Sequence, residues 1–324
     1  MKKLITMALI ASSIVITTMP AQALLKTRTA TPTLAILDTA LDTSIPSIKS
    51  RLIGEVCILD WASCPNGKSF QEGPGSTTLP MNILSNANFN HGTQMASIAL
   101  ANNPNLNIVF VRIFGNTARG DKQTTGVNTL VNALNWVKQN SVKYNIVAVS
   151  SSSGSTGPVI NMNANSNYCA PTALDAVVTN LNSIGIPVFF PSGNSGLNAK
   201  MKNKIEWPAC ISQSIAVGGV SVPSEIVMLD APTVNMQSNY DKKLVDVWGD
   251  WHSKSIYPGN LNGTSVGTSV ATQVIASKYV ALKTAKPTLS LTDLISLMKS
   301  SSSTVLNSVN QEVYLFDLGK AING

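Results

Sequence analysis

This chain of 324 residues is poor in several residue types, and each shortage narrows what the protein can do. It has only two histidines, His91 and His252, and four cysteines without Cys-x-x-Cys spacing, so a zinc site is not expected. Charged residues make up 12% of the chain, and the net charge of +7 comes without an arginine-rich run, so no nucleic-acid partner is expected. No G-x-G-x-x-G follows the first apolar run, which counts against a nucleotide site and a nucleotide cofactor.

Long apolar runs are also missing, except at the N-terminus. Residues 1–3 are basic, residues 4–18 are mainly apolar, and residues 20–23 end in a small-x-small pattern. This order predicts a Sec-type signal peptide over residues 1–23 and export to the periplasm or the medium. An uncleaved anchor is the alternative, but the apolar stretch is short for a membrane span, so no stable membrane insertion is expected.

Apolar runs of strand length alternate with helical patterns along the rest of the chain. This alternation predicts an α/β fold in one domain over residues 24–324, with a mostly parallel twisted sheet and helices on both faces. The polar stretch Gly67–Asn90 is predicted to be a surface loop. The predicted strands are 33–38, 107–113, 145–150, 186–190, 214–218 and 313–316, and the predicted helices are 91–102, 125–140, 171–184, 264–284 and 290–300.

A serine nucleophile and its base are the next candidates. Ser265 follows Gly263, which permits a tight turn, and precedes a helical apolar pattern, so it is predicted to lie at the mouth of a helix. Backbone N–H groups and the helix dipole would stabilise an oxyanion there. His91 is predicted to project from the start of a buried helix, with Gly92 allowing the backbone to turn, whereas His252 is predicted to be a surface residue.

An orienting acid completes this set. The apolar run Thr33–Leu37 ends in Asp38, so this carboxylate is predicted at the carboxyl end of a buried strand, where open α/β sheets bind ligands. It can hold the Nδ1–H of a histidine. Asp42, four residues later, is interpreted as structural or solvated.

These segments, in the order Asp38, His91 and Ser265, resemble the subtilisin-like serine proteases, or subtilases. The likeness runs from about residue 33 to about residue 304. The matching segments are Leu34–Asp42, His91-Gly92-Thr93, Ile146–Gly154, Pro187–Asn194 and Gly263-Thr264-Ser265.

The resemblance implies a serine endopeptidase that acts on a polypeptide substrate through an acyl-enzyme. No cofactor and no metal are expected for this chain. Asn194 would donate to the oxyanion together with the backbone N–H of Ser265. The protein is expected to be a monomer. The segments implied to line the substrate cleft contribute Ser150, Ser151, Ser152, Pro191, Ser192 and Gly193, and the serines are expected to make one wall polar.

Several positions depart from the family pattern. Val266-Gly267-Thr268-Ser269 stands where the family usually continues Met-Ala-Ser-Pro, which motivates a catalytically silent binding protein as the alternative.

The helix after His91 leads directly to the strand that begins at Asn107, so the family's calcium loop is expected to be absent. Too few residues separate Ala23 from Asp38 for a folded propeptide. A sedolisin-like relative, which uses Glu as its base, is disfavoured by His91.

The even number of cysteines in a chain predicted to be exported favours disulfides. The sequence permits three connectivities, of which Cys57–Cys64 together with Cys169–Cys210 is preferred.

Overall fold

Strand β1 (Thr33–Asp38) is an inner strand of the main sheet and is buried on both faces. Its even-numbered apolar residues pack into one hydrophobic core and its odd-numbered ones into a second. A strand covered on both faces needs apolar side chains in both directions, which explains the continuous run Leu34–Leu37.

The computed structural model describes residues 31–60, 63–116, 125–154, 169, 172–201, 203–241, 243–306 and 312–324. Within these residues the main sheet has eleven strands and a separate hairpin has two. The predicted signal peptide lies outside them. The spatial order of the main sheet is β12 (Ser303–Leu306), β13 (Glu312–Leu315), β9 (Val247–Asp250), β7 (Ile215–Ser221), β6 (Val188–Pro191), β5 (Ile146–Ser151), β1, β4 (Asn107–Arg112), β2 (Leu52–Ile58) and β3 (Phe70–Glu72), with β8 (Thr233–Val234) paired to β7.

Every neighbouring pair from β13 to β2 is parallel, and antiparallel strands occur only at β3, β8 and β12 within the described part of the sheet. This arrangement confirms the predicted α/β class with a mostly parallel sheet.

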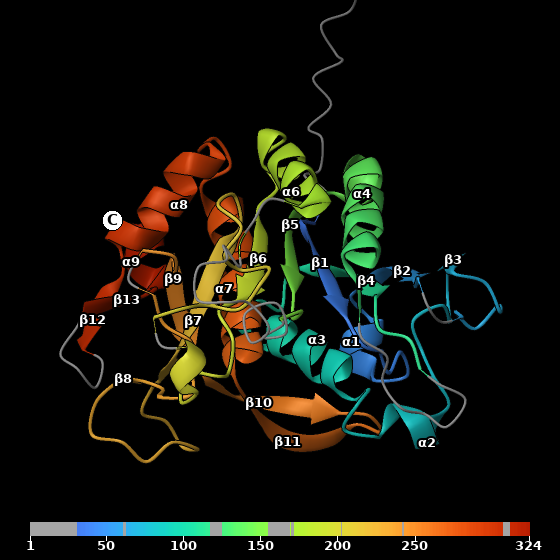
Figure 1. The fold of residues 1–324 in the computed structure, drawn as a ribbon, viewed down its shortest axis with the longest axis horizontal. Helices are drawn as coiled ribbons and strands as arrows, with labels where there is room; N and C mark the ends of the chain where they lie inside the picture. Colours follow the sequence, from blue (N-terminus) through green and yellow to red (C-terminus); the bar gives the residue numbers. More distant parts are fainter. Residues whose placement is uncertain are drawn as a thin grey trace, which may run out of the picture. The chain divides into compact units, whose positions relative to one another are not determined.

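Helices cover both faces of the sheet (Figure 1). Helices α4 (Val127–Tyr144) and α6 (Ala173–Ser183) pack on the core with the odd-numbered residues of β1, and α3 (His91–Asn102) and α7 (Thr268–Ala285) pack on the other. None of the described helices is both long enough and apolar enough to span a membrane. The remaining helices are α1 (Pro46–Lys49), α2 (Met81–Leu84), the 3₁₀ helix η1 (Ala199–Met201), α8 (Leu291–Ser300) and α9 (Leu318–Asn323).

Helices α3 and α7 run side by side in the same direction. Met95 and Ile98 of α3 form one apolar cluster with Val270 and Val274 of α7. Further along, the amide of Asn103 donates to the backbone oxygen of Ser277 at 3.3 Å. The first turns of both helices therefore lie at the same end of this seam.

Two sequence predictions about elements were wrong. The helix predicted from residue 264 begins at Thr268, because residues 261–266 form strand β11 (Leu261–Val266), which pairs with β10 (His252–Tyr257) as an antiparallel hairpin. The stretch predicted as a loop, Gly67–Asn90, contains β3 and α2. Both misses involve polar or short segments that lack an apolar period.

Candidate active site

Asp38 and His91 meet at the carboxyl edge of the sheet. Asp38 is the last residue of β1 and is fully buried, and His91 is the first residue of α3 with about a third of its side chain exposed. The Nδ1 atom of His91 lies 2.8 Å and 3.0 Å from the two carboxylate oxygens of Asp38. The Nε2 atom forms no hydrogen bond with the described residues and is the one left for proton exchange with another group.

The environment keeps Asp38 ionised. Burial opposes ionisation, but the charge of His91 and its hydrogen bond outweigh burial, and the N–H of Thr39 and the hydroxyl of Ser152 donate as well. The pKa of Asp38 is therefore below its ordinary value. An ionised carboxylate at Nδ1 fixes the tautomer and the orientation of the His91 ring.

Thr39 and Gly92 position His91. The hydroxyl of Thr39 donates to the carbonyl of Phe89 at 2.9 Å and accepts from the N–H of Gly92 at 3.0 Å. A Cβ atom on Gly92 would lie 2.4 Å from the carbonyl oxygen of Ala40. Gly92 is thus needed for a close approach of α3 to the chain after β1, and not for a turn as the sequence suggested.

The structure does not place Ser265 at a helix mouth. Ser265 lies in strand β11 and is 7% exposed. Its hydroxyl donates to Gln94 Oε1 at 2.6 Å and lies 2.7 Å from the hydroxyl of Ser255. Gly263 contacts the ring of Tyr257 in the hairpin and makes no turn before a helix. The expectation that Ser265 lies at the start of the helix was wrong because α7 begins within a second Gly-Thr-Ser, four residues beyond the first.

This second motif, Gly267-Thr268-Ser269, lies at the N-terminus of α7 instead. Gly267 has a φ of 128°, which favours glycine, and precedes the first residue of α7. Ser269 is the second residue of α7 and is partly exposed, and its hydroxyl makes no hydrogen bond with any residue that the structure describes. Its neighbour Val270 packs with Met95 of α3, so Ser269 lies at the same end of the seam as His91.

Asn194 is attached to this helix mouth. It is exposed in the loop after β6, and its Oδ1 accepts from the backbone N–H of Thr268 at 2.9 Å and from the Thr268 hydroxyl at 2.8 Å. These bonds hold the side-chain oxygen inward. The Nδ2 group has no acceptor among the described residues and remains available as a donor beside Ser269.

The residues predicted to line the cleft are mostly turned inward. Ser150 and Ser151 are fully buried, and the Ser150 hydroxyl donates to Gln273 of α7 at 2.9 Å. The Ser192 hydroxyl donates to the carbonyl of Asn239 at 2.9 Å, and Pro191 and Gly193 are buried. The predicted polar wall of serine hydroxyls was therefore wrong for Ser150 and Ser151, since these side chains bind the protein itself.

The two remaining candidates have other environments. Asp42 is structural, as predicted, because its carboxylate accepts from Ser44 and from the N–H of Gly259. His252 is not a free surface residue: it lies in β10, its Nδ1 is buried without a partner among the described residues, and burial lowers its pKa.

The structure joins Cys57 to Cys64 and Cys169 to Cys210, the connectivity that the sequence analysis preferred. Among the described residues, no cluster of three or more His, Cys, Asp or Glu side chains is arranged to hold a metal ion.

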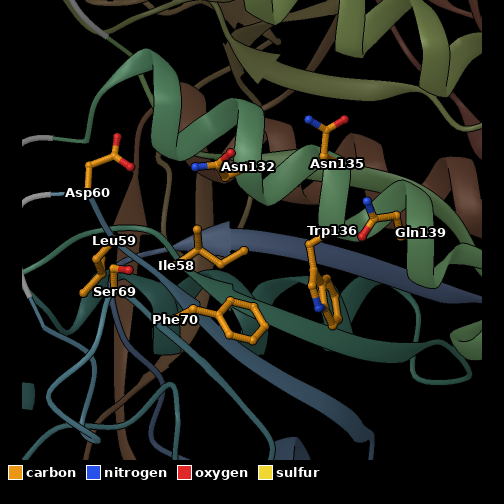
Figure 2. Close-up of a pocket in the computed structure, with 9 residues that line it drawn as sticks. All are labelled: Ile58, Leu59, Asp60, Ser69, Phe70, Asn132, Asn135, Trp136 and Gln139. Carbon is orange, nitrogen blue, oxygen red and sulfur yellow. The ribbon is translucent and has the colours of Figure 1, made fainter.

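A separate hollow of about 730 Å³ lies between the β2–β3 region and α4 (Figure 2). Asp60, Phe70 and Trp136 are among its lining residues, and none of the candidate site residues lines it. This hollow is therefore distinct from the edge of the sheet where Asp38 and His91 meet.

Comparisons with known proteins find similarity to serine proteases. The chain is 25% identical over 258 residues to the "Major intracellular serine protease" of Bacillus subtilis (strain 168), a match that covers 77% of this chain and 67% of that protein. A solved cold-adapted subtilisin-like serine proteinase matches with a TM-score of 0.62 at 19% identity, covering 89% of this chain and 88% of that one. Proteases from Pseudoalteromonas arctica match with a TM-score of 0.68 at 17% identity, covering 90% and 89%. These two structures show the same fold.

The fold and these relatives define a serine-type peptidase, a hydrolase that acts on polypeptides. The chain belongs to the subtilase family, whose model matches residues 29–315.

Proposed function

We propose that this chain is an endopeptidase whose triad is Asp38, His91 and Ser269. The observation that carries the proposal is the attachment of Asn194 to Thr268, because it brings an amide donor beside the serine that opens α7. The close pair of Asp38 and His91 at the same edge supplies the base.

The reaction follows from these positions. His91 Nε2 takes the proton of the Ser269 hydroxyl as its oxygen forms a bond to the substrate carbonyl carbon. The Nδ2 of Asn194 and the backbone N–H of Ser269 donate to the developing oxyanion. His91 then gives its proton to the amine as the C–N bond breaks, and water repeats the sequence on the acyl-enzyme, which releases the acid and restores Ser269.

Labelling with a fluorophosphonate tests the nucleophile. We expect the wild type to be labelled, Ser269→Ala to be unlabelled, and Ser265→Ala to remain labelled, since Ser265 contacts Gln94 and Ser255 instead of substrate. Labelling of Ser269→Ala but not of Ser265→Ala would return the nucleophile to Ser265. A folded wild type that neither takes the label nor cleaves casein would favour the silent binding protein.

We also propose that residues 1–23 direct export and are removed. The N-terminal pattern and the two disulfides support this assignment. Mass spectrometry of the protein from periplasm and medium should find a chain that begins at Leu24. A chain that keeps Met1 and stays in the cytosol would contradict export.

A further inference from the structure

Glu206 is a buried carboxylate that the proposed mechanism does not use. It is 9% exposed, and it lies between Gly154, which follows β5, and Gly193, which follows β6. A Cβ atom on Gly154 would lie 2.7 Å from Glu206 Oε2, and one on Gly193 would lie 2.4 Å from Glu206 Cγ. The absence of side chains at these two positions gives the carboxylate its room.

The carboxylate is held next to the oxyanion donor. The Ser195 hydroxyl donates to Glu206 Oε1 at 3.0 Å, and the backbone N–H of Asn194 also donates to this side chain. The backbone N–H of Glu206 donates to the carbonyl of Ser192 at 2.7 Å. These hydrogen bonds fix Glu206 next to Asn194, the residue that would bind the carbonyl oxygen of the substrate.

Within the part of the chain that the structure describes, Glu206 takes part in none of the ion pairs. The charge of its carboxylate is therefore not balanced by a cation there. Burial raises the pKa of Glu206, and the hydrogen bonds from Ser195 and Asn194 oppose that rise. A buried carboxylate without a cationic partner carries a desolvation cost, which a cation from a ligand would offset.

We propose that Glu206 makes the enzyme prefer a lysine or arginine side chain on the substrate residue that donates the scissile carbonyl. This inference rests on the proposed function, because it takes the carbonyl to be bound by Asn194. The side chain of that same residue starts beside the Asn194 loop, and a long chain with a cationic end reaches the Glu206 carboxylate between Gly154 and Gly193. Arginine fits best, since its fork can pair with a carboxylate in bidentate fashion.

A purely structural role for Glu206 makes a different prediction. If the carboxylate only supports Ser195 and Asn194, its loss should lower turnover for every substrate by the same factor. If it binds a cationic side chain, its loss should affect only substrates that carry one.

Two peptides that differ only by arginine or citrulline at this position separate these roles, because citrulline keeps the shape and removes the charge. We expect wild-type kcat/KM to favour the arginine peptide by about 30-fold or more, the lower range for a buried charge pair. In Glu206→Gln the ratio should fall to near one while the citrulline rate is kept. Glu55→Gln is the matched control: Glu55 is also 9% exposed, but it bonds Thr77 and Gly75, and its ratio should stay at the wild-type value.

A wild-type ratio near one, or an equal loss for both peptides in Glu206→Gln, would overturn the inference. If Glu206→Gln does not fold, Glu206→Asp replaces it in the test: this variant keeps the charge on a shorter side chain and should keep part of the preference for arginine.

Failure of the proposed function is seen separately, as loss of fluorophosphonate labelling and of cleavage of both peptides. In that case calorimetric binding of the two peptides to folded Ser269→Ala decides: tighter binding of the arginine peptide supports the Glu206 preference, and equal or absent binding refutes it.

Discussion

At the scale of single residues, Asn194 combines two tasks that substitutions can separate. Its Oδ1 holds the first turn of α7 through Thr268, and its Nδ2 is the proposed donor to the oxyanion. We expect Asn194→Ala to lower kcat by roughly 10²–10³ with little change in KM, because the lost bond is made mainly in the transition state. Steady-state kinetics on a neutral peptide measures this effect.

The control for that experiment is Asn182→Ala, which removes an amide that donates to Gln213 outside the site. It should leave kcat unchanged. A value of kcat for Asn194→Ala within twofold of the wild type would remove Asn194 from the mechanism.

The candidate site could be predicted from the sequence only in part. Asp38 and His91 were predicted and do form a close pair, because each directly ends or begins a strongly apolar element. The serine at the start of α7 was missed because Gly-Thr-Ser occurs twice, four residues apart. The usable signal lay in the two residues after each serine, since Val270-Ala271 after Ser269 is closer to the family's Met-Ala than Val266-Gly267 is after Ser265.

At the scale of elements, the contact between α3 and the chain after β1 depends on Gly92. Glycine to alanine inside a helix ordinarily stabilises by about 1 kcal/mol. Here the added methyl would meet Ala40 O at 2.4 Å and the Phe110 ring at 2.7 Å, so we expect Gly92→Ala to destabilise the fold by about 1–3 kcal/mol. Urea unfolding measures the change in the free energy of unfolding.

Ala101→Gly, on the exposed part of the same helix, gives the effect of helix propensity alone. Because Ala101 lies in the last turn of α3, this change should lower the free energy of unfolding by at most about 1 kcal/mol. An increase in stability for Gly92→Ala would show that α3 can move away from Ala40 without strain.

Elements with a strong apolar period were predicted within a few residues, as β1, β4 and α3 illustrate. The β10–β11 hairpin was missed because its apolar residues do not mark a buried face: Leu261 and Val266 are exposed, whereas the buried side chains include Ser255 and Ser265, whose hydroxyls lie 2.7 Å apart. Such strands depend on tertiary contacts that no local pattern contains.

At the scale of the whole molecule, the two disulfides should contribute unequally to stability. The Cys169–Cys210 bridge spans 41 residues and Cys57–Cys64 spans 7. Loop entropy predicts losses of about 4 and about 2 kcal/mol for the respective double Cys→Ser variants. Denaturant unfolding of the two variants checks this order, and a larger loss for Cys57 and Cys64 would contradict it.

The Asp38–His91 pair should make the free energy of unfolding depend on pH. The pKa of Asp38 is lowered in the folded state, so its ionised form favours folding. This stabilisation is fully present above the unfolded-state pKa of about 3.9 and is lost as pH falls through the lower folded-state value. We expect Asp38→Asn to flatten the fall in unfolding free energy between about pH 5 and pH 2. Parallel pH profiles for variant and wild type would contradict this.

The seam between α3 and α7 has a consequence for how inactive variants arise. Short side chains such as Ala99 and Ala271 belong to the core that both helices share, so the helices can approach closely. A bulkier residue there would tilt one helix against the other and separate His91 from Ser269 while leaving both in the chain. A genetic screen for loss of activity should therefore return substitutions in the middle of these helices, with kinetics that resemble deletion of a reacting group.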